Sequence, residues 1–254
     1  MARIFITGSS GGLGLEAGGQ LVAGGHDVVL HARNAERADA ARGALAACQD
    51  VAIGDVSTLS GMHALADRIG ALGDFDAVIH NVGVFEGRTR GETEDGFTPT
   101  FAVNVIAPYL LTATTPRPRR LIYLSSSMHR SGNPGLSDPM FEARRWDATQ
   151  AYCDSKLYDT MLAFALAQRW PDRRINAVDP GWMPTNMGGK SASGDIPTGA
   201  ATQVWLATAD DADITGGYFL EKREERPAPS ATDPDAQARL LAYLEELTGV
   251  SLPD

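Results

Sequence analysis

The chain has 254 residues, a formal net charge of −10 and two cysteines. Its length suits one large domain or two small ones, and a single doubly wound α/β domain fits it without forcing. The acidity argues against nucleic acid or an anionic membrane as the main partner, and the spacing of Cys48 and Cys153 is typical of neither a metal site nor a disulfide framework, so we expect no metal.

Apolar runs bounded by polar or glycine-containing turns alternate with longer helical patterns along the chain. The expected strands are Arg3–Ile6, Asp27–His31, Val51–Ile53, Phe75–His80, Arg120–Ser125, Arg174–Val178 and Tyr218–Leu220. The expected helices are Gly12–Ala23, Ala35–Ala46, Ser60–Leu72, Phe97–Thr112, Gln150–Trp170, Thr198–Thr208 and Asp235–Leu247. This alternation predicts one doubly wound Rossmann-type α/β domain over residues 1–254, with a parallel sheet of about seven strands and helices on both faces.

Three stretches have no regular pattern: 131–148, 181–197 and 221–234. The first two follow strands at the carboxyl edge of the predicted sheet, where ligands of such folds bind. We therefore expect substrate loops near 128–148 and 181–197, and a solvated surface loop over 221–234. Because the N-terminus enters a strand almost at once and no apolar run approaches the length of a membrane span, we expect a cytoplasmic protein.

The segment from Thr7 to Gly14 reads Thr-Gly-Ser-Ser-Gly-Gly-Leu-Gly and lies between an apolar strand and a helix. Gly8 permits a tight turn, Gly12 lets the backbone approach a pyrophosphate, and Gly14 allows close packing. The positive end of the helix dipole then faces the phosphates. The segment predicts a dinucleotide site, and the alternative is a plain strand–helix turn.

The end of the second predicted strand indicates which dinucleotide is bound. Ala32 occupies the place where an NAD enzyme carries a carboxylate for the ribose 2′-hydroxyl, and Arg33 follows it. A guanidinium can pair with a 2′-phosphate, so the sequence favours NADP over NAD, unless Arg33 is simply a surface cation. Asp55 is expected to bind the adenine amino group, although an acidic helix N-cap would look the same.

Tyr152 and Lys156 are four residues apart on one predicted helix, so their side chains leave from the same face. A free tyrosine titrates near pH ~10, and a nearby ammonium lowers that pKa toward the working pH of a proton donor. Ser125-Ser126-Ser127 place hydroxyls at the end of a buried strand. Asn104 places an amide inside an apolar helix, where it serves either to satisfy buried polar groups or as part of a proton relay.

Together these motifs resemble the short-chain dehydrogenase/reductase family, from the first strand to beyond Leu220. The glycine-rich turn matches that family's Thr-Gly-x-x-x-Gly-x-Gly. The resemblance implies that Ser126 holds the substrate oxygen and that Tyr152 gives or takes the proton. It also implies that Lys156 lowers the pKa of Tyr152 and binds the nicotinamide ribose, and that Asn104 orders a water leading to the lysine.

The motifs and the resemblance together imply a set of cofactor-binding residues, of which Thr185 would meet the carboxamide. The set is Gly8, Ser10, Gly12, Leu13, Gly14, Arg33, Asp55, Val56, Asn81, Gly83, Tyr152, Lys156, Pro180, Gly181 and Thr185. The implied function is NADP(H)-dependent interconversion of an alcohol and a carbonyl. The alternatives are a dinucleotide-binding redox sensor without turnover and a nucleotide-sugar epimerase or dehydratase.

Two further segments, Phe141–Trp146 and Leu244–Gly249, are similar to the retinol dehydrogenase and protochlorophyllide reductase branch of the family. That similarity implies a small lipophilic alcohol or carbonyl as substrate. His80 departs from the family, which usually has asparagine there, and we interpret it as a hydrogen-bonded core residue. The helix after Asn104 is short and followed by prolines, and in many family members it forms the dimer face. The chain is therefore expected to be a monomer or a dimer.

Overall fold

The structure is a computed structural model that describes residues 1–253. Within these residues the chain forms an eight-stranded sheet with the order β3-β2-β1-β4-β5-β6-β7-β8. The strands are β1 (Arg3–Ile6), β2 (Asp27–Ala32), β3 (Asp50–Ile53), β4 (Ala77–His80), β5 (Arg120–Leu124), β6 (Arg174–Asp179), β7 (Tyr218–Leu220) and β8 (Arg223–Glu224). The first seven are parallel, and β8 is antiparallel to β7.

The longer helices are α1 (Gly12–Ala23), α2 (Ala35–Ala44), α3 (Leu59–Leu72), α5 (Ala107–Thr114), α6 (Ala148–Arg169), α7 (Ile196–Thr208) and α8 (Pro234–Thr248). The predicted fold class is confirmed, and each predicted strand and helix is present to within two residues at either end. Strand β8, which pairs with β7 in a hairpin, was not among the predicted strands.

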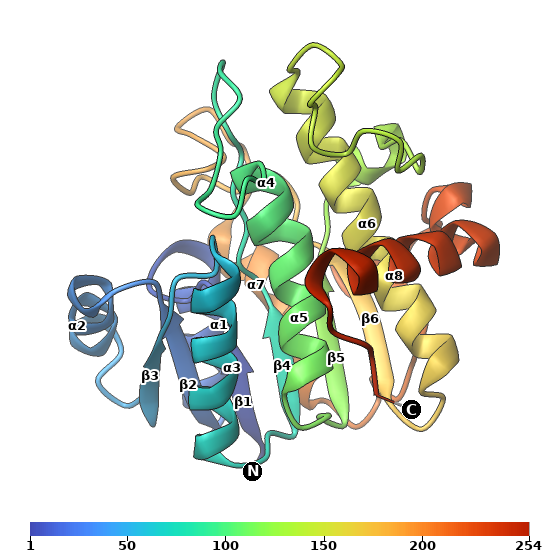
Figure 1. Cartoon of the computed structure of the whole chain (residues 1–254). Coiled ribbons are helices and arrows are strands. Elements are labelled where there is room, and N and C mark those ends of the chain that lie inside the picture. Colours follow the sequence, from blue (N-terminus) through green and yellow to red (C-terminus); the bar gives the residue numbers. More distant parts are fainter. Residues whose placement is uncertain (254) are drawn as a thin grey trace.

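The central strands are apolar on both faces because helices cover both faces of the sheet (Figure 1). Phe5 packs into the cluster formed with α3, α5 and α6, whereas Ile4 and Ile6 pack into the cluster formed with α1, α2 and α7. Successive residues of a strand point to opposite faces. The sheet is therefore enclosed on both sides, and its carboxyl edge is the place left for a ligand.

The segment predicted as one helix over Phe97–Thr112 is divided into three parts. A short helix α4 (Pro99–Phe101) continues into a π-helical turn, η1 (Ala102–Ile106), and then into α5. The π turn holds one extra residue and has Asn104 at its centre. Helix α5 ends at Thr114, shortly before Pro116, as expected for a residue that breaks helices.

The prediction of a solvated surface loop over 221–234 is only partly right: residues 221–226 are exposed, but the segment contains regular structure and two buried residues. Glu221 and Lys222 form the turn into β8, and a 3₁₀ turn, η3 (Pro229–Thr232), follows it. Ala228 and Ala231 are buried in the core beside α6 and α8. Two isolated alanines among prolines and charged residues carry no periodicity, so the sequence did not reveal that this segment is packed.

The C-terminal residues cover the face of the molecule formed by α5 and α6. Helix α8 lies across α6 (Figure 1). The Tyr109 hydroxyl of α5 donates to the Val250 carbonyl at 2.7 Å, and Leu252 is buried in the core. Within residues 1–253, the helices are too short or too polar to traverse a lipid bilayer.

Arg120 joins β5 to the end of α7, so its loss is expected to destabilise the fold. Its buried guanidinium donates to the carbonyls of Leu206, Ala209 and Ala212. Arg120→Met leaves these carbonyls without that donor and should lower the free energy of unfolding by about 3 kcal/mol. Urea unfolding measures the change. The matched control is Arg119→Met at the exposed neighbouring position, and equal loss in both variants would contradict the expectation.

Candidate active site

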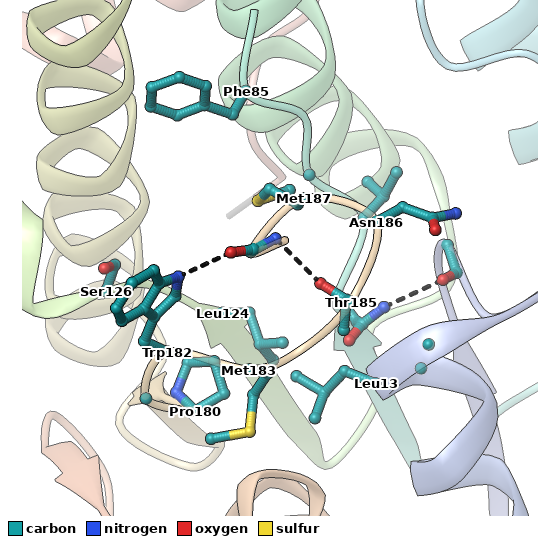
Figure 2. A pocket seen from close by; sticks show the side chains of 18 of the residues that line it. Leu13, Phe85, Leu124, Ser126, Pro180, Trp182, Met183, Thr185, Asn186 and Met187 are labelled. Atoms are coloured by element: carbon teal, nitrogen blue, oxygen red, sulfur yellow. Dashed lines mark hydrogen bonds between the residues drawn. The ribbon is translucent and has the colours of Figure 1, made fainter. Parts of the chain in front are cut away.

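A cavity of about 700 Å³ lies at the carboxyl edge of β1, β4, β5 and β6. In Figure 2, Ser126 and Trp182 lie at one end of this cavity and Leu13 and Thr185 at the other, beside the start of α1. The predicted site residues that line it are Gly8, Ser10, Gly12, Leu13, Gly14, Asn81, Gly83, Ser126, Tyr152, Lys156, Pro180, Gly181 and Thr185. Residues distant in sequence, predicted separately for cofactor and for catalysis, therefore share one cavity.

The glycine-rich turn is closely packed against the end of β4. Gly8 has a φ of +62°, and a Cβ atom there would lie 2.7 Å from the Cα of Val82. A Cβ atom on Gly14 would lie 2.5 Å from the Nδ2 of Asn81. That amide donates to the carbonyls of Thr7 and Gly8 at 3.0 and 3.1 Å. Glycine is therefore required at both positions, and Asn81 fixes the shape of the turn.

The N-terminus of α1 lacks the side-chain cap that other helices of the chain carry. Asn34, Thr58, Asp147, Asp195 and Asp233 cap α2, α3, α6, α7 and α8 with side-chain oxygens. The N-cap residue of α1 is glycine, which has no side chain to accept a hydrogen bond. The first amides of α1 thus remain available at the cavity, and such amides bind phosphate groups. The residues fit a dinucleotide pyrophosphate.

His31, in β2, joins the two loops that follow β1 and β3. Its Nδ1 accepts from the Gly8 amide at 2.9 Å, so the hydrogen is on Nε2, which donates to the Gly54 carbonyl at 2.8 Å. The backbone amide of His31 donates to the Ser9 hydroxyl at 2.8 Å. Burial lowers the pKa of His31, which keeps the ring neutral. Sequence reasoning missed this residue because both ring partners come from other loops.

At the adenosine end of the predicted site, two of the predicted residues lie outside the cavity lining, and their contacts with a cofactor stay predictions. Arg33 is exposed and lies outside the cavity lining, whereas Arg37, in the first turn of α2, contributes to it. The signal that could have revealed Arg37 is its position in the first turn of the helix that follows β2. Asp55 also lies outside the lining and accepts from the Ser57 amide at 2.9 Å. The alternative that Asp55 caps α3 is wrong, because Thr58 is the N-cap.

Val56 and Asn104, the other predicted site residues outside the cavity lining, are buried. Val56 packs into the core. The Asn104 Oδ1 accepts from the Val84 amide at 2.8 Å, and its Nδ2 donates to the Val84 carbonyl and to the Ser155 hydroxyl at 3.0 Å. Asn104 therefore joins the π turn, the loop after β4 and α6. Its relay role stays a prediction.

The three serines after β5 all line the cavity, but Ser125 and Ser126 differ in what their hydroxyls bond to. Ser125 is buried and bonds to the Lys156 carbonyl and the Thr160 hydroxyl, at 3.1 and 2.7 Å. Ser126 lines the cavity, and its hydroxyl accepts from the Met128 amide at 3.3 Å. Its hydrogen remains free to be donated into the cavity. Ser126 can therefore donate a hydrogen bond to a ligand in the cavity, and its contact with a substrate oxygen stays a prediction.

His129 connects the Ser126 segment to the packed residues after β8. The Ala228 amide donates to its Nε2 at 2.9 Å, so Nδ1 carries the hydrogen and donates to the Ser126 carbonyl at 2.7 Å. The ring is fully buried, lies against the tilted ring of Tyr218 and has a pKa lowered by burial. His129 therefore supports the serine segment through a hydrogen bond at each ring nitrogen.

Tyr152 lines the cavity one turn before Lys156, and the lysine Nζ lies 5.8 Å from the tyrosine ring centroid. Burial raises the pKa of Tyr152; Lys156 lowers it, and the carboxylates of Asp159 and Asp179 raise it further. The net direction is upward. Lys156 thus lowers this pKa as expected, but burial and the two carboxylates, which the sequence spacing does not show, outweigh it in the chain by itself.

The loop over 181–197 places apolar side chains at the cavity. Trp182 and Met187 are 57% and 44% exposed, yet both line the cavity, as do Met183 and, from the loop after β4, Phe85 (Figure 2). The Trp182 indole N–H donates to the Gly188 carbonyl at 3.0 Å. This loop therefore folds back on itself. The loop over 128–148 contributes Met128 to the same lining.

Thr185 lies directly over the glycine-rich turn. A Cβ atom on Gly12 would lie 3.4 Å from the Thr185 methyl group. The Thr185 hydroxyl accepts from the Gly188 amide at 3.3 Å. Its predicted contact with a carboxamide stays a prediction.

Comparisons with known proteins agree with this geometry. The family model described as short chain dehydrogenase matches residues 2–127. The short-chain dehydrogenase chry4 of Gibberella zeae is 40% identical, and the match covers 100% of this chain and 99% of that protein. Human retinol dehydrogenase 13 is 28% identical, over 98% of this chain and 85% of that protein.

Solved structures have the same fold. A crystal structure of a protein from Mycobacterium paratuberculosis has a TM-score of 0.88 and 26% identity, and the match covers 100% of this chain and 96% of that one. A blue fluorescent protein from a metagenomic library, solved in complex with NADPH, has a TM-score of 0.69 and 22% identity. The match covers 86% of this chain and 95% of that protein.

The close packing at Gly14 predicts a selective loss of dinucleotide binding. Gly14→Ala forces a Cβ atom against the Asn81 amide and the Gly8 carbonyl, so the turn must open and the affinity for NADPH should fall about tenfold or more. Calorimetric titration with NADPH measures this. The matched control is Gly19→Ala in the same helix, where a Cβ atom meets nothing within 4 Å. Equal affinity of the two variants would contradict the expectation.

Proposed function

Because the chain belongs to the short-chain dehydrogenase/reductase family of oxidoreductases, we propose that it interconverts an alcohol and a carbonyl with NADP(H) and uses Tyr152 as acid and base. The observation that carries the proposal is the shared cavity of Ser126, Tyr152 and Lys156, which also holds the glycine-rich turn. A protein that only senses dinucleotides needs no such set of proton-handling groups.

In the proposed reduction, Ser126 donates a hydrogen bond to the substrate carbonyl oxygen as negative charge develops on it. Tyr152 transfers its proton to that oxygen, and Lys156 stabilises the tyrosinate that remains. The nicotinamide supplies the hydride when bound. Phe85 packs against the Tyr152 ring, with centroids 5.2 Å apart, and limits the positions that the phenol can take.

The cofactor preference for NADP(H) is supported by two guanidinium groups at the predicted adenosine end. Arg37 lines the cavity, and Arg33 lies four residues before it, directly after β2. A 2′-phosphate carries charge that pairs well with arginine, and Ala32 offers no carboxylate to repel it. The structural relatives solved with NADPH and NADP are consistent with this choice.

A lipophilic substrate is supported by the apolar mouth of the cavity. Phe85, Trp182 and Met187 expose large apolar surfaces there, and Met128 and Met183 extend them. Transfer of an apolar ligand from water onto such surface contributes roughly 25 cal/mol per Å² buried. The similarity to retinol dehydrogenases points to the same class of substrate.

Tyr152→Phe tests the proposed proton transfer. Removing the hydroxyl should lower kcat for a panel of lipophilic aldehydes and ketones by a factor on the order of 10³, because a positioned acid contributes about that much. NADPH affinity should change little. Oxidation of NADPH followed by absorbance gives the rates. The control is Tyr243→Phe, a tyrosine of α8 outside the cavity lining. Retention of full turnover by Tyr152→Phe would disprove the proposal.

Arg37→Ala and Arg33→Ala test the cofactor preference. Each variant should bind NADPH about tenfold more weakly, with little change toward NADH, because the 2′-phosphate distinguishes the two ligands. Dissociation constants for both dinucleotides measure the ratio. Arg42→Ala, at the other end of α2, is the control. Tighter binding of NADH than of NADPH by the unaltered protein would overturn the assignment.

A further inference from the structure

A buried carboxylate accompanies the lysine of the proposed catalytic set. The Lys156 Nζ donates to Asp159 Oδ2 at 2.7 Å, and both side chains are only 5% exposed. The same Nζ donates to the Leu124 carbonyl at 2.7 Å. An ammonium has three hydrogens, so these contacts leave one for the side of the cavity.

The ion pair is expected to contribute little more to the stability of the fold than uncharged residues would. Burying two charges costs desolvation that their attraction only roughly offsets, so a buried pair is weak evidence for stability. Asp159 lies one turn after Lys156, and Lys156 lies one turn after Tyr152. The carboxylate is therefore placed to reduce the effect of the Lys156 charge on the protonation of Tyr152.

The titratable groups around Tyr152 come from several elements. Helix α6 contributes Lys156, Asp159 and the Cys153 thiol, and β6 contributes Asp179. Asp179 is held by the Tyr218 hydroxyl at 3.1 Å and the Gly181 amide at 2.8 Å. The buried phenol of Tyr123 on β5 faces Asp159, and His129 after β5 is neutral. One ammonium thus faces two carboxylates.

We propose that Asp159 is a positioning residue whose carboxylate binds the Lys156 ammonium and offsets its charge, so that Tyr152 keeps its proton to a higher pH than the lysine alone would allow. This inference rests on the proposed function. Its consequence is that carbonyl reduction, which needs the protonated phenol, continues further into the alkaline range. Alcohol oxidation, which needs the tyrosinate, begins at correspondingly higher pH.

The directions of the pKa shifts agree with this arrangement. Burial opposes the charge of Lys156, but Asp159 and Tyr152 outweigh it and raise the lysine pKa. Burial raises the pKa of Asp159 to about 6, with Lys156 acting in the opposite direction, so the carboxylate is ionised above that pH. Across the neutral and alkaline range both partners are therefore charged, and Asp159 raises the pKa of Tyr152.

The test is the pH dependence of turnover in Asp159→Asn, which keeps a hydrogen-bond acceptor for Lys156 and removes the charge. The pH at which the reductive kcat begins to fall should move lower, and the pH at which oxidation begins should move lower with it. A merely structural role would reduce kcat by the same factor at every pH. Asp154→Asn is the matched control, because Asp154 is a buried carboxylate of the same helix paired with Arg144 at 2.9 Å.

A titration without turnover separates this inference from the proposed function. The absorbance of tyrosinate is followed against pH in the protein and in Tyr152→Phe, and the difference is the titration of Tyr152. Repeating the pair with Asp159→Asn, or with Asp159→Ser if the first variant does not fold, should move the difference curve to lower pH. An unmoved or upward-shifted curve would overturn the role of Asp159. Absence of turnover by the unaltered protein would remove only the proposed function.

Discussion

The buried ammonium of Lys156 is the contact on which the geometry of the site depends. It binds the last carbonyl of β5 and a carboxylate of its own helix, and Ser125 returns a hydrogen bond to the Lys156 carbonyl. These bonds fix the register of α6 against the end of the sheet. Tyr152, one turn earlier, is thereby held at the cavity that Ser126 also lines. Loss of either charged partner would leave the other buried and uncompensated, which proteins tolerate poorly.

The parallel sheet brings the remaining parts together. The ends of β1, β4, β5 and β6 meet at one edge, and the loops that follow them carry the glycine-rich turn, Asn81, Ser126 and Gly181. Two buried neutral histidines then join loops that the sheet alone would leave independent. His31 links the ends of β1, β2 and β3, and His129 links the serine segment to residues after β8. Each ring uses one nitrogen as donor and the other as acceptor, which a protonated imidazole would not satisfy.

The predictable parts of this molecule are those whose signal is local in the sequence. Strands that are apolar on both faces, the glycine-rich turn and the Tyr152–Lys156 pair can each be recognised within a few residues of sequence. The fold class follows from the alternation of strands and helices. Asp159 is equally local, one turn after the lysine, but its burial and its pairing with Lys156 are visible only in the fold. The role of His129 was not accessible, because its partner Ala228 is 99 residues away. The upward shift of the Tyr152 pKa could not be predicted from the sequence either, because burial, its largest cause, is a property of the assembled fold.

The unprotected start of α1 has a thermodynamic consequence. Helices that begin on asparagine, threonine or aspartate are complete without a ligand, whereas the first turn of α1 begins on glycine. A dinucleotide that occupies this position contributes to the native state alone, so mass action ties conformational stability to its concentration. At one hundred times the dissociation constant the gain is about 2.7 kcal/mol. Inside a cell, the supply of the coenzyme would then govern the lifetime of the polypeptide as well as its rate of turnover.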